Sequence, residues 1–596
     1  MDEKPAGQAP PAFSPQILMG LYLRGDHDAL SENLLAILRH FRETSYHALD
    51  ARGRHFVNEF VKAFLNLFTQ ADYVPSREHI TEFVRINLTT SNLVAMSSFG
   101  TTDVFLDLLG GPPANLGKFL ALYSARNTAV IPRKAIFDAD PTLASVWYGA
   151  YAEAYRSGLP NARACDNLRG HFASADDRID VRHMSMDGYF SSSYLDGDCD
   201  RVVKSVLNAA VRRVAVAGGL RPRNRPDSRK VAVLSGHWSP IHSVYRICSA
   251  YVDALEGYHL TLVQLGRRND ADVGRFQEVR RVDFDKNGVP DLTPLLDNDF
   301  AVAYFPDVGL TPQSVLLANL RIAPVQIASL GHSVSTWGAD IDYFVSGADV
   351  EPLNPERNYS ERLVLLPGCG AVHERPDYSP SGRNRKTNAP EFIINCPWNA
   401  QKVNHRFCLT LRELIGRSPR KILLRLFASA SLDRRNDYLP FVRDLHALLG
   451  AGNVEVRHAM AYRDYMALME EGDLGIDSYP FGGCNTVADS LHIRKLMVTY
   501  EGDRWYNRIG SRMLRMVGLP ELAATSEEDY LSTTLRLIAD DPYRASLQER
   551  LDRADLDATI FNRAEARDFR KAVDYLVENH DRLRGETDRS AIRIGP

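Results

Sequence analysis

The spacing of apolar residues predicts that roughly the first third of the chain is helical. From about residue 16 to residue 215, apolar residues recur at intervals of three and four, as in LSENLLAILRHF (30–41), FVNEFVKAFLNLF (56–68) and DRVVKSVLNAAVRRVAVA (200–217). Strand-like alternation is scarce in this stretch, and no 34-residue helical repeat is recognisable. We therefore expect an all-helical domain over 16–220, without tandem helical hairpins.

The pattern changes near residue 221, where the polar, proline-containing stretch RPRNRPDSR (221–229) predicts a linker. After it, short apolar runs of strand length alternate with helical stretches, which is typical of parallel βα units. A loop-like segment, ERPDYSPSGRNRKTNAP (374–390), separates two such series. The first series comprises 231–235, 259–265, 300–305, 324–330 and 342–347, and the second comprises 391–397, 421–428, 453–459, 473–480 and 495–502.

These two series predict two doubly wound α/β domains, over 228–373 and 388–585. The second ends in a closing helix, whose Phe569, Ala572, Val573 and Leu576 share one face. Ligands of such domains bind beyond the carboxyl ends of the parallel strands. Two sheets of this kind are therefore expected to face one cleft that suits a two-part ligand.

Composition narrows the class of protein. The 596 residues are 44% hydrophobic and 24% charged, which is ordinary for a globular protein, and the net charge of −4 gives no field that would hold a nucleic acid. No apolar run is long enough to span a membrane, and residues 1–15 read as a Pro-rich flexible leader without the apolar core of a signal peptide. The seven cysteines form no C-x-x-C pair, which favours free thiols and a cytoplasmic location.

The first candidate for chemistry is the stretch from Gly236 to Arg246, directly after the strand at 231–235. It carries His237 and His242, and imidazoles can give or take a proton near neutral pH. The plainer interpretation is a capped helix start with histidines bonded to the backbone. A second, weaker candidate is the turn that holds Gly331 and His332 after the strand at 324–330, since ordinary turn chemistry explains it equally well.

The most informative candidate is the stretch from Asp477 to Asp489, where a strand runs through Gly482 and Gly483 into a helix. Glycines allow a close approach of the backbone, and the free N–H groups of a helix start favour an anion. Asn485 or Thr486 is expected to cap this helix. Asp489 lies one turn inside it, where a carboxylate is expected to bond sugar hydroxyls or to orient the cap. Lys402, after the strand at 391–397, would offer a movable positive charge to a diphosphate, or is simply a surface lysine.

Other nucleotide signatures are missing from the sequence. It contains no Gly-x-x-x-x-Gly-Lys-Ser/Thr and no Gly-x-Gly-x-x-Gly after a strand, so ATPase and simple dinucleotide functions lose support. No Asp-x-Asp stands at a strand end of the second series, where it would hold a divalent metal under a diphosphate.

Taken in order, these motifs resemble glycosyltransferase family 41, and in particular the bacterial cytoplasmic N-glycosyltransferases of adhesins. The same family contains the eukaryotic O-linked N-acetylglucosamine transferase. The resemblance spans roughly residues 100 to 580. It rests on HWSPIHSVYR (237–246), NLRIAPVQIASLGH (319–332), IDYF (341–344), WNAQK (398–402), SYPFGGCNTVAD (478–489), VGLPE (517–521) and the helical stretch 187–213.

The resemblance implies a GT-B fold, an inverting reaction, a UDP-sugar donor (UDP-glucose or another UDP-hexose) and no metal cofactor. The implied acceptor is an Asn in Asn-x-Ser/Thr of a protein such as an adhesin or autotransporter. The residues it assigns to donor binding are Lys402, Asn485, Thr486, Gly482, Gly483, Tyr462, Tyr465 and His332. Those it places at the reaction centre are His237, His242 and Asp489, with His237 as the candidate base and His242 near donor and acceptor.

The chain departs from the bacterial enzymes around the sugar and the acceptor. It has Gly483-Cys484-Asn485-Thr486 in place of Asn-Thr-Asn-Gly, and Ser239 in place of a third histidine. The turn after Gly331-His332 is also of a different type. An alternative is therefore a family member that glycosylates Ser or Thr hydroxyls, as of flagellin or an adhesin. A non-enzyme alternative is a chaperone or scaffold that kept the GT-B shell without donor affinity.

Overall fold

The computed structural model describes residues 13–44, 46–110, 115–153, 161–195, 197–215, 220, 223–285, 288–382, 391–427, 432 and 437–595. The chain divides into two compact units. Unit 1 comprises Met1–Ser192, Trp398–Gly416 and Leu423–Met460, and unit 2 comprises Ser193–Pro397, Arg417–Ile422 and Ala461–Pro596. Each unit is described by itself.

Unit 1 is mainly helical, and local sequence explains where its helices begin. The side chains of Asp26, Asp50, Ser76 and Asn161 each accept a hydrogen bond from a first-turn N–H, which satisfies a donor that would otherwise lack a partner. Two strands of this unit, β9 (Ile422–Phe427) and β10 (Val454–Arg457), pair in parallel. The helices that lie wholly or almost wholly in unit 1 are α1 (Pro15–Leu23), α2 (His27–Glu43), α3 (Ala51–Phe68), α4 (Arg77–Arg85), α5 (Asn87–Met96), α6 (Asp103–Leu108), α7 (Leu116–Leu122), α8 (Arg133–Ala139), α9 (Pro141–Glu153), α10 (Ala162–Ala173), α11 (Asp187–Ser191), α16 (His405–Arg417) and α17 (Tyr438–Leu449).

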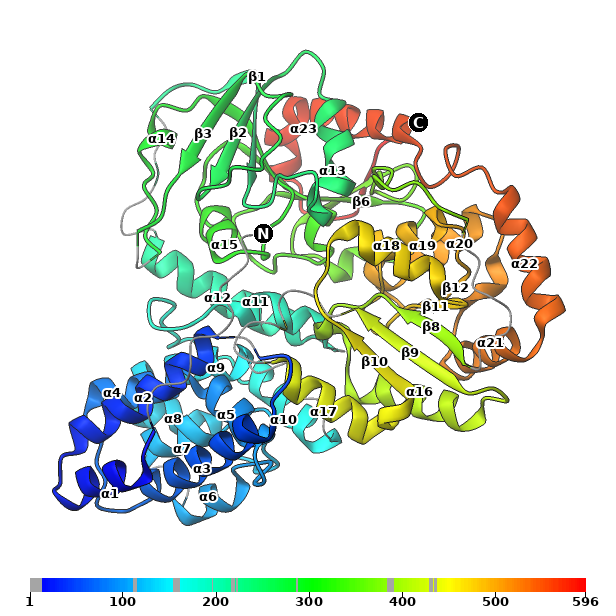
Figure 1. Ribbon diagram of the computed structural model, residues 1–596. Helices are drawn as coiled ribbons and strands as arrows, with labels where there is room; N and C mark the ends of the chain where they lie inside the picture. The colour runs from blue at the N-terminus through cyan, green and yellow to red at the C-terminus, as the bar shows by residue number, and fades with distance from the viewer. Residues whose placement is uncertain are drawn as a thin grey trace. The chain divides into compact units, whose positions relative to one another are not determined.

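Unit 2 contains an eight-stranded parallel sheet in the order β14-β7-β6-β5-β4-β1-β2-β3 (Figure 1). Its central strand β4 is buried along its whole length, as expected for a parallel sheet covered on both faces. The strands are β1 (Asp227–Ser235), β2 (His259–Leu265), β3 (Glu278–Val282), β4 (Phe300–Phe305), β5 (Val325–Ala328), β6 (Tyr343–Gly347), β7 (Arg362–Leu366) and β14 (Ile592–Arg593).

A second parallel sheet contributes four neighbouring strands to unit 2, in the order β8-β11-β12-β13. These are β8 (Phe392–Cys396), β11 (Leu474–Ile476), β12 (Met497–Tyr500) and β13 (Ala523–Ala524). The helices of unit 2 are α12 (Cys199–Ala215), α13 (Ser243–Asp253), α14 (Thr293–Leu296), α15 (Pro312–Ala318), α18 (Tyr462–Glu471), α19 (Asn485–His492), α20 (Ile509–Met516), α21 (Glu527–Ala539), α22 (Asp541–Arg553) and α23 (Arg567–Gly585). Two parallel α/β sheets after a helical region confirm the predicted α/β fold class.

The last helix returns to the first sheet. Its predicted apolar face is confirmed, because Phe569, Ala572, Val573 and Leu576 are all buried. The Phe569 ring packs 4.8 Å from Tyr251 of α13, and Figure 1 shows α23 next to α13. Beyond α23, β14 pairs in parallel with β7, with Ile592 opposite Val364. Residues 567–593 thus complete the first sheet.

The structure departs from the sequence prediction in several places. The end of the predicted linker 221–229 belongs to β1, which begins at Asp227, and the strand predicted at 473–480 is only Leu474–Ile476. Strands β3, β7, β13 and β14 were not predicted; β3 reads EVRRV and carries too many charges to resemble a buried strand. Residues 1–12 of the predicted leader, and 383–390 of the predicted interdomain loop, lie outside the described residues. The predicted domain boundaries stay predictions.

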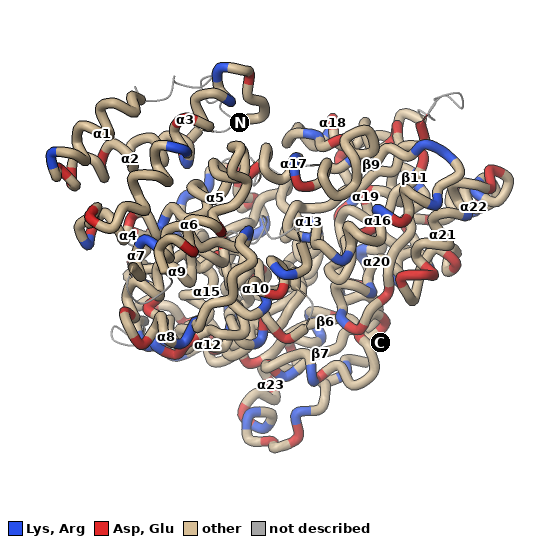
Figure 2. Tube along the Cα trace, turned by 90° about the horizontal axis from the view of Figure 1, so that it is seen from below, with Lys and Arg blue, Asp and Glu red and all other residues tan. Residues whose placement is uncertain are grey.

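Charge and cysteine chemistry follow the sequence. Figure 2 shows Lys and Arg interspersed with Asp and Glu over the described part of the chain. All seven cysteines lie in the described part of the chain and are present as thiols, as predicted. Among the described residues, no helix has both the length and the hydropathy to cross a bilayer.

Candidate functional site

The turn after β1 holds the two predicted imidazoles in a fixed geometry. The buried carboxylate of Asp307 accepts from Ser235 Oγ at 2.7 Å and from the Gly236 N–H at 3.2 Å. Ser235 Oγ in turn accepts from the His237 N–H at 2.9 Å. Burial raises the pKa of Asp307 to about 6. The backbone at the start of the motif is therefore fixed by a side chain from the end of the neighbouring strand β4.

The rings of His237 and His242 stack on each other, with centroids 4.1 Å apart and planes inclined by 9°. His242 Nδ1 accepts from the Val244 N–H at 3.2 Å, so His242 caps α13, as the plainer interpretation of this motif predicted. Burial, together with the positive charge of Arg268, lowers the pKa of His237 to about 4 and that of His242 to about 3. Both imidazoles are neutral at pH 7.

Asp489, one turn inside α19, forms a buried ion pair that was not predicted from the sequence. Arg246 of α13 approaches its carboxylate to 2.6 Å, and the side chains of Arg246 and Asp489 are only 11% and 3% exposed. Tyr462 Oη donates to the same carboxylate at 2.7 Å, and the Arg246 guanidinium lies 5.4 Å from the Tyr462 ring centroid. Burial lowers the pKa of Arg246, but the Asp489 carboxylate outweighs it, so the net direction is upward. Asp489 therefore links α19 to α13 and α18.

A second link joins the N-terminal ends of α13 and α19. Asn485 Nδ2 donates to the carbonyl of Ser243 at 3.0 Å, and Asn485 Oδ1 accepts from His373 at 3.3 Å. The prediction that Asn485 or Thr486 caps α19 is wrong. The cap residue is Cys484, with no side-chain cap hydrogen bond, because the Asn485 amide is used across the helices instead.

The Gly482-Gly483 turn allows a close approach, but to the protein itself. A Cβ on Gly482 would lie 2.8 Å from the carbonyl of Tyr506, and one on Gly483 would lie 2.3 Å from Thr486 Oγ1. Asp477 accepts from the Gly483 N–H at 2.9 Å. The glycines thus permit tight packing of the turn that leads into α19.

His332 is buried in the 3-10 turn after β5. Its Nε2 lies 3.4 Å from Lys204 Nζ and 3.3 Å from Ser193 Oγ. Burial lowers the pKa of Lys204 to about 8 and shifts the pKa of His332 downward. His332 thus faces helix α12, and its predicted contact with the donor stays a prediction.

Helix α12 holds the loop that follows His332 through side chains spaced four residues apart. Such residues lie on one helix face, and here each contacts the loop 335–338. Asp200 accepts a hydrogen bond from Trp337 Nε1 at 2.9 Å. The other three side chains donate to backbone carbonyls of the loop: Lys204 to Ser335 at 3.2 Å, Asn208 to Thr336 at 2.7 Å, and Arg212 to Gly338.

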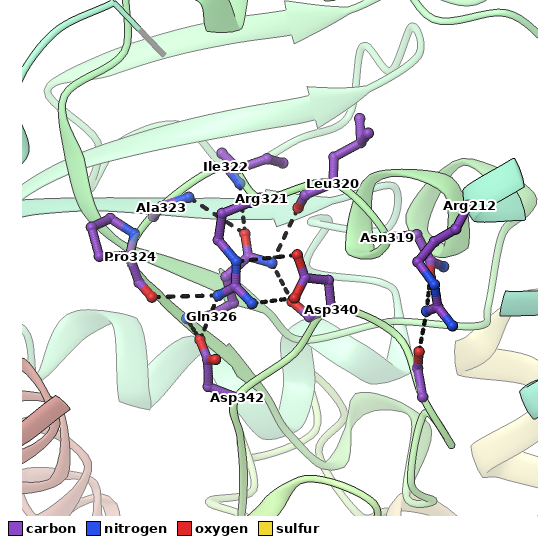
Figure 3. Close-up of polar contacts among 11 residues, drawn as sticks. Arg212, Asn319, Leu320, Arg321, Ile322, Ala323, Pro324, Gln326, Asp340 and Asp342 are labelled. Carbon is purple, nitrogen blue, oxygen red and sulfur yellow. Dashed lines mark hydrogen bonds and ion pairs between the residues drawn. The ribbon is translucent and has the colours of Figure 1, made fainter. Parts of the chain in front are cut away.

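The stretch 319–342, which contains part of the family-like motif, is held by its own polar contacts (Figure 3). Arg321 pairs with Asp340 and, at 2.7 Å, with Asp342. Gln326 accepts from the Ile322 N–H at 2.9 Å and donates to the carbonyl of Leu320 at 3.1 Å. These residues of the family-like motif therefore shape the entry to β5.

The other predicted site residues are distributed over both units. In unit 2, Tyr462 and Tyr465 of α18 lie with ring centroids 5.9 Å apart, and burial raises the pKa of both phenols. In unit 1, Lys402 ends the 3-10 turn Ala400–Lys402, whose start is capped by Asn399. Among the described residues, no group of three or more His, Cys, Asp or Glu side chains is arranged to hold a metal ion.

Comparisons with known proteins reveal relatives in sequence and in fold. No family model matches the chain. Over 380 residues it is 25% identical to the UDP-glucose:protein N-beta-glucosyltransferase of Actinobacillus pleuropneumoniae serotype 5b, with 61% of this chain and 60% of that protein aligned. Over 281 residues it is 26% identical to a tomato (Solanum lycopersicum) protein named probable UDP-N-acetylglucosamine--peptide N-acetylglucosaminyltransferase SPINDLY, with 41% and 27% aligned. The alignments thus span less than two thirds of these relatives.

Among solved structures, a mutant O-GlcNAc transferase of Thermobaculum terrenum superposes with a TM-score of 0.53 at 18% identity, covering 96% of this chain and 98% of that one. Together with the two parallel sheets, this similarity shows that the chain has the GT-B fold. In sequence the chain is similar to bacterial proteins named UDP-glucose:protein N-beta-glucosyltransferase, which are UDP-sugar glycosyltransferases.

Proposed function

We propose that the chain transfers a hexose, most readily glucose, from a UDP-sugar to Asn side chains in Asn-x-Ser/Thr segments of a protein such as an adhesin, in the cytoplasm. The transfer inverts the anomeric centre and needs no metal. The observation that carries this proposal is the joining of the α13 and α19 N-termini by Asn485 and by the Arg246–Asp489 pair, next to the stacked imidazoles. The similarity to proteins named UDP-glucose:protein N-beta-glucosyltransferase supports the donor and the acceptor class.

The charge of the departing UDP has to be met in the absence of a metal. Helix N-termini carry partial positive charge, and the starts of α13 and α19 provide two of them. We assign Lys402 to the donor diphosphate as well, and Asn485, Thr486, Gly482, Gly483, Tyr462, Tyr465 and His332 to donor binding. Loss of one such charged contact costs about 2–4 kcal/mol of transition-state stabilisation.

The acceptor amide is a weak nucleophile, so positioning has to supply much of the acceleration. His237 and His242 lie at the start of α13, beside the proposed diphosphate site. Asp489 is already engaged by Arg246 and Tyr462, and its contribution is to hold the helices in place.

The second candidate is transfer of glucose or N-acetylglucosamine to Ser or Thr hydroxyls. It is favoured by the alignment to a protein named as a peptide N-acetylglucosaminyltransferase. It is also favoured by the departures at Cys484 and Thr486, which lie where sugar and acceptor are expected to meet.

The test is incubation of the full chain with UDP-glucose or UDP-N-acetylglucosamine and peptides containing Asn-x-Thr, Gln-x-Thr or a lone Ser, read by intact mass. We expect hexose on the Asn-x-Thr peptide only, unchanged by a chelator, and a loss of about 30-fold or more in Lys402→Ala. Hexose on the Ser peptide alone would establish the second candidate. Loss of transfer on adding chelator would reject metal independence, and NMR of the product's anomeric proton checks inversion.

A further inference from the structure

Arg268 contacts His237 in a way that determines which ring nitrogen carries hydrogen. Its Nη1 lies 3.0 Å from His237 Nδ1 and also donates to the carbonyl of Gly236 at 3.0 Å. A guanidinium has donors only, so Nδ1 accepts this hydrogen bond. In a neutral imidazole the hydrogen then resides on Nε2.

The orientation of Arg268 is itself fixed. Asp270 accepts from Arg268 Nε at 3.0 Å and from Nη2 at 3.1 Å, which is a bidentate pair that leaves Nη1 for the imidazole. Ser239 Oγ donates to the same carboxylate at 2.8 Å. Ser239 stands where the family-like motif has another histidine, and here it anchors the group that holds Arg268.

We propose that Arg268 is a positioning residue that keeps the hydrogen of His237 on Nε2. His237 then acts as a hydrogen-bond donor and as the stacking support of His242, and not as the base that removes a proton from the acceptor. This inference rests on the proposed function for its catalytic meaning, but the state of the imidazole does not depend on it.

The arrangement is the reverse of the one that makes a histidine a base. In a Ser-His-Asp triad a carboxylate accepts from Nδ1–H, which leaves a lone pair on Nε2 for proton abstraction. Here a cation donates into Nδ1, so the Nε2 lone pair is taken by hydrogen, and a second proton would have to be accepted beside Arg268. Asp270 faces the same ring region but is paired with Arg268, and the Asp307 carboxylate is engaged by the Ser235 hydroxyl and the Gly236 N–H.

The other groups around the His237 ring are compatible with hydrogen on Nε2. His242 stacks on His237, and its own Nδ1 accepts from Val244, so its hydrogen is also on Nε2. The Leu310 carbonyl raises the pKa of His237, as a carbonyl does near a ring N–H, but burial and Arg268 outweigh it. Both neutral imidazoles therefore carry their hydrogen on Nε2.

The first experiment reads the tautomer directly, by two-bond ¹H–¹⁵N NMR of the ¹⁵N-histidine-labelled full chain at pH 7, with the signal assigned by its loss in His237→Gln. We expect hydrogen on Nε2 in the wild type, and in Arg268→Met a mixture of tautomers with titration of His237 closer to the ordinary pKa. The matched control is Arg267→Met, since Arg267 is exposed and forms no hydrogen bond or ion pair within the described part of the chain. A wild-type hydrogen on Nδ1, or a spectrum unchanged in Arg268→Met, would overturn the proposal.

The second experiment compares His237→Gln with His237→Ala in the transfer assay. A carboxamide donates a hydrogen bond but does not take up a proton at neutral pH, so Gln should keep activity within about tenfold of wild type, whereas loss of a general base costs about 10²–10⁴-fold. Equal losses of that size in both variants would show that His237 is the base. If the wild type transfers no sugar at all, the proposed function fails while the NMR result still decides the tautomer.

Discussion

The Arg246–Asp489 ion pair should be the most sensitive link between α13 and α19. Arg246→Met leaves the Asp489 carboxylate buried without its cation, and among the described residues only the Tyr462 hydroxyl then donates to it. Breaking a buried pair by removing one partner costs about 3–5 kcal/mol. Because a factor of ten corresponds to about 1.4 kcal/mol, local opening of α19 should become roughly a hundredfold to a few thousandfold more frequent.

Hydrogen–deuterium exchange followed by mass spectrometry measures this opening at peptides of α13 and α19. A local readout is needed, because a protein of several domains has no single free energy of unfolding. The matched control is Arg420→Met, since Arg420 and Asp541 also approach to 2.6 Å but are 41% and 52% exposed. An exposed pair contributes about 0–1 kcal/mol, so exchange near Asp541 should change less than about fivefold.

A double variant separates a lost charge pair from simple damage to packing. Arg246→Met with Asp489→Leu removes both charges and should recover most of the protection, since replacing a whole buried pair by apolar groups is often neutral. The two single changes should therefore be strongly non-additive. Exchange at α19 within threefold of wild type in Arg246→Met, or a double variant worse than the sum of the singles, would refute the reasoning.

Two further predictions concern stability. In the folded protein the pKa values of His237 (about 4) and His242 (about 3) lie below the value of 6.5 of a free imidazole. As the pH falls, the unfolded chain therefore takes up protons first, and each imidazole lowers the stability of the folded state by up to about 3 kcal/mol between pH 7 and pH 4. The fall in Tm between pH 7 and pH 4 should thus be smaller in the His237→Gln/His242→Gln variant than in the wild type. Asp307, whose pKa is raised, stabilises the folded state as the pH falls, but it does so equally in both proteins. An identical fall in the two proteins would contradict the lowered pKa values of the two histidines. Gly483→Ala places a Cβ 2.3 Å from Thr486 Oγ1 and should destabilise the folded state by about 1–3 kcal/mol, measured as a lower Tm. A second change, Thr486→Ala, removes that contact and should partly restore the Tm. If the Tm does not recover, another contact limits the turn.

Hydrophobic pattern predicted the buried strands well, because strands covered on both faces are continuous apolar runs. The runs at 259–265 and 300–305 coincide with β2 and β4 to the residue. Strand β3 was not predicted, since it lies at the sheet edge and three of its five residues are charged. A strand can therefore be predicted from a single sequence when both of its faces are buried.

The candidate site was predicted less completely, because local spacing does not reveal long-range pairs. Arg246 and Asp489 are 243 positions apart, and nothing in the sequence near either residue indicates that the two pair. The same applies to His373 beside Asn485 and to Arg268 beside His237. The preference of Asn for helix N-caps led to a wrong prediction for Asn485, because its side chain donates to the Ser243 carbonyl and does not cap α19. Residue types at strand ends supplied the candidate residues, but their interaction partners could be found only from the fold.

The return of α23 and β14 to the first sheet has a consequence for biosynthesis. The ribosome makes β7 more than two hundred residues before β14, its partner at the sheet edge. At typical elongation rates of about 5–20 residues per second, the nascent sheet waits roughly 10–50 seconds for its outer strand and for the helix that covers it. During that interval β7 is an open strand edge, and such an edge is a template on which other nascent chains can pair.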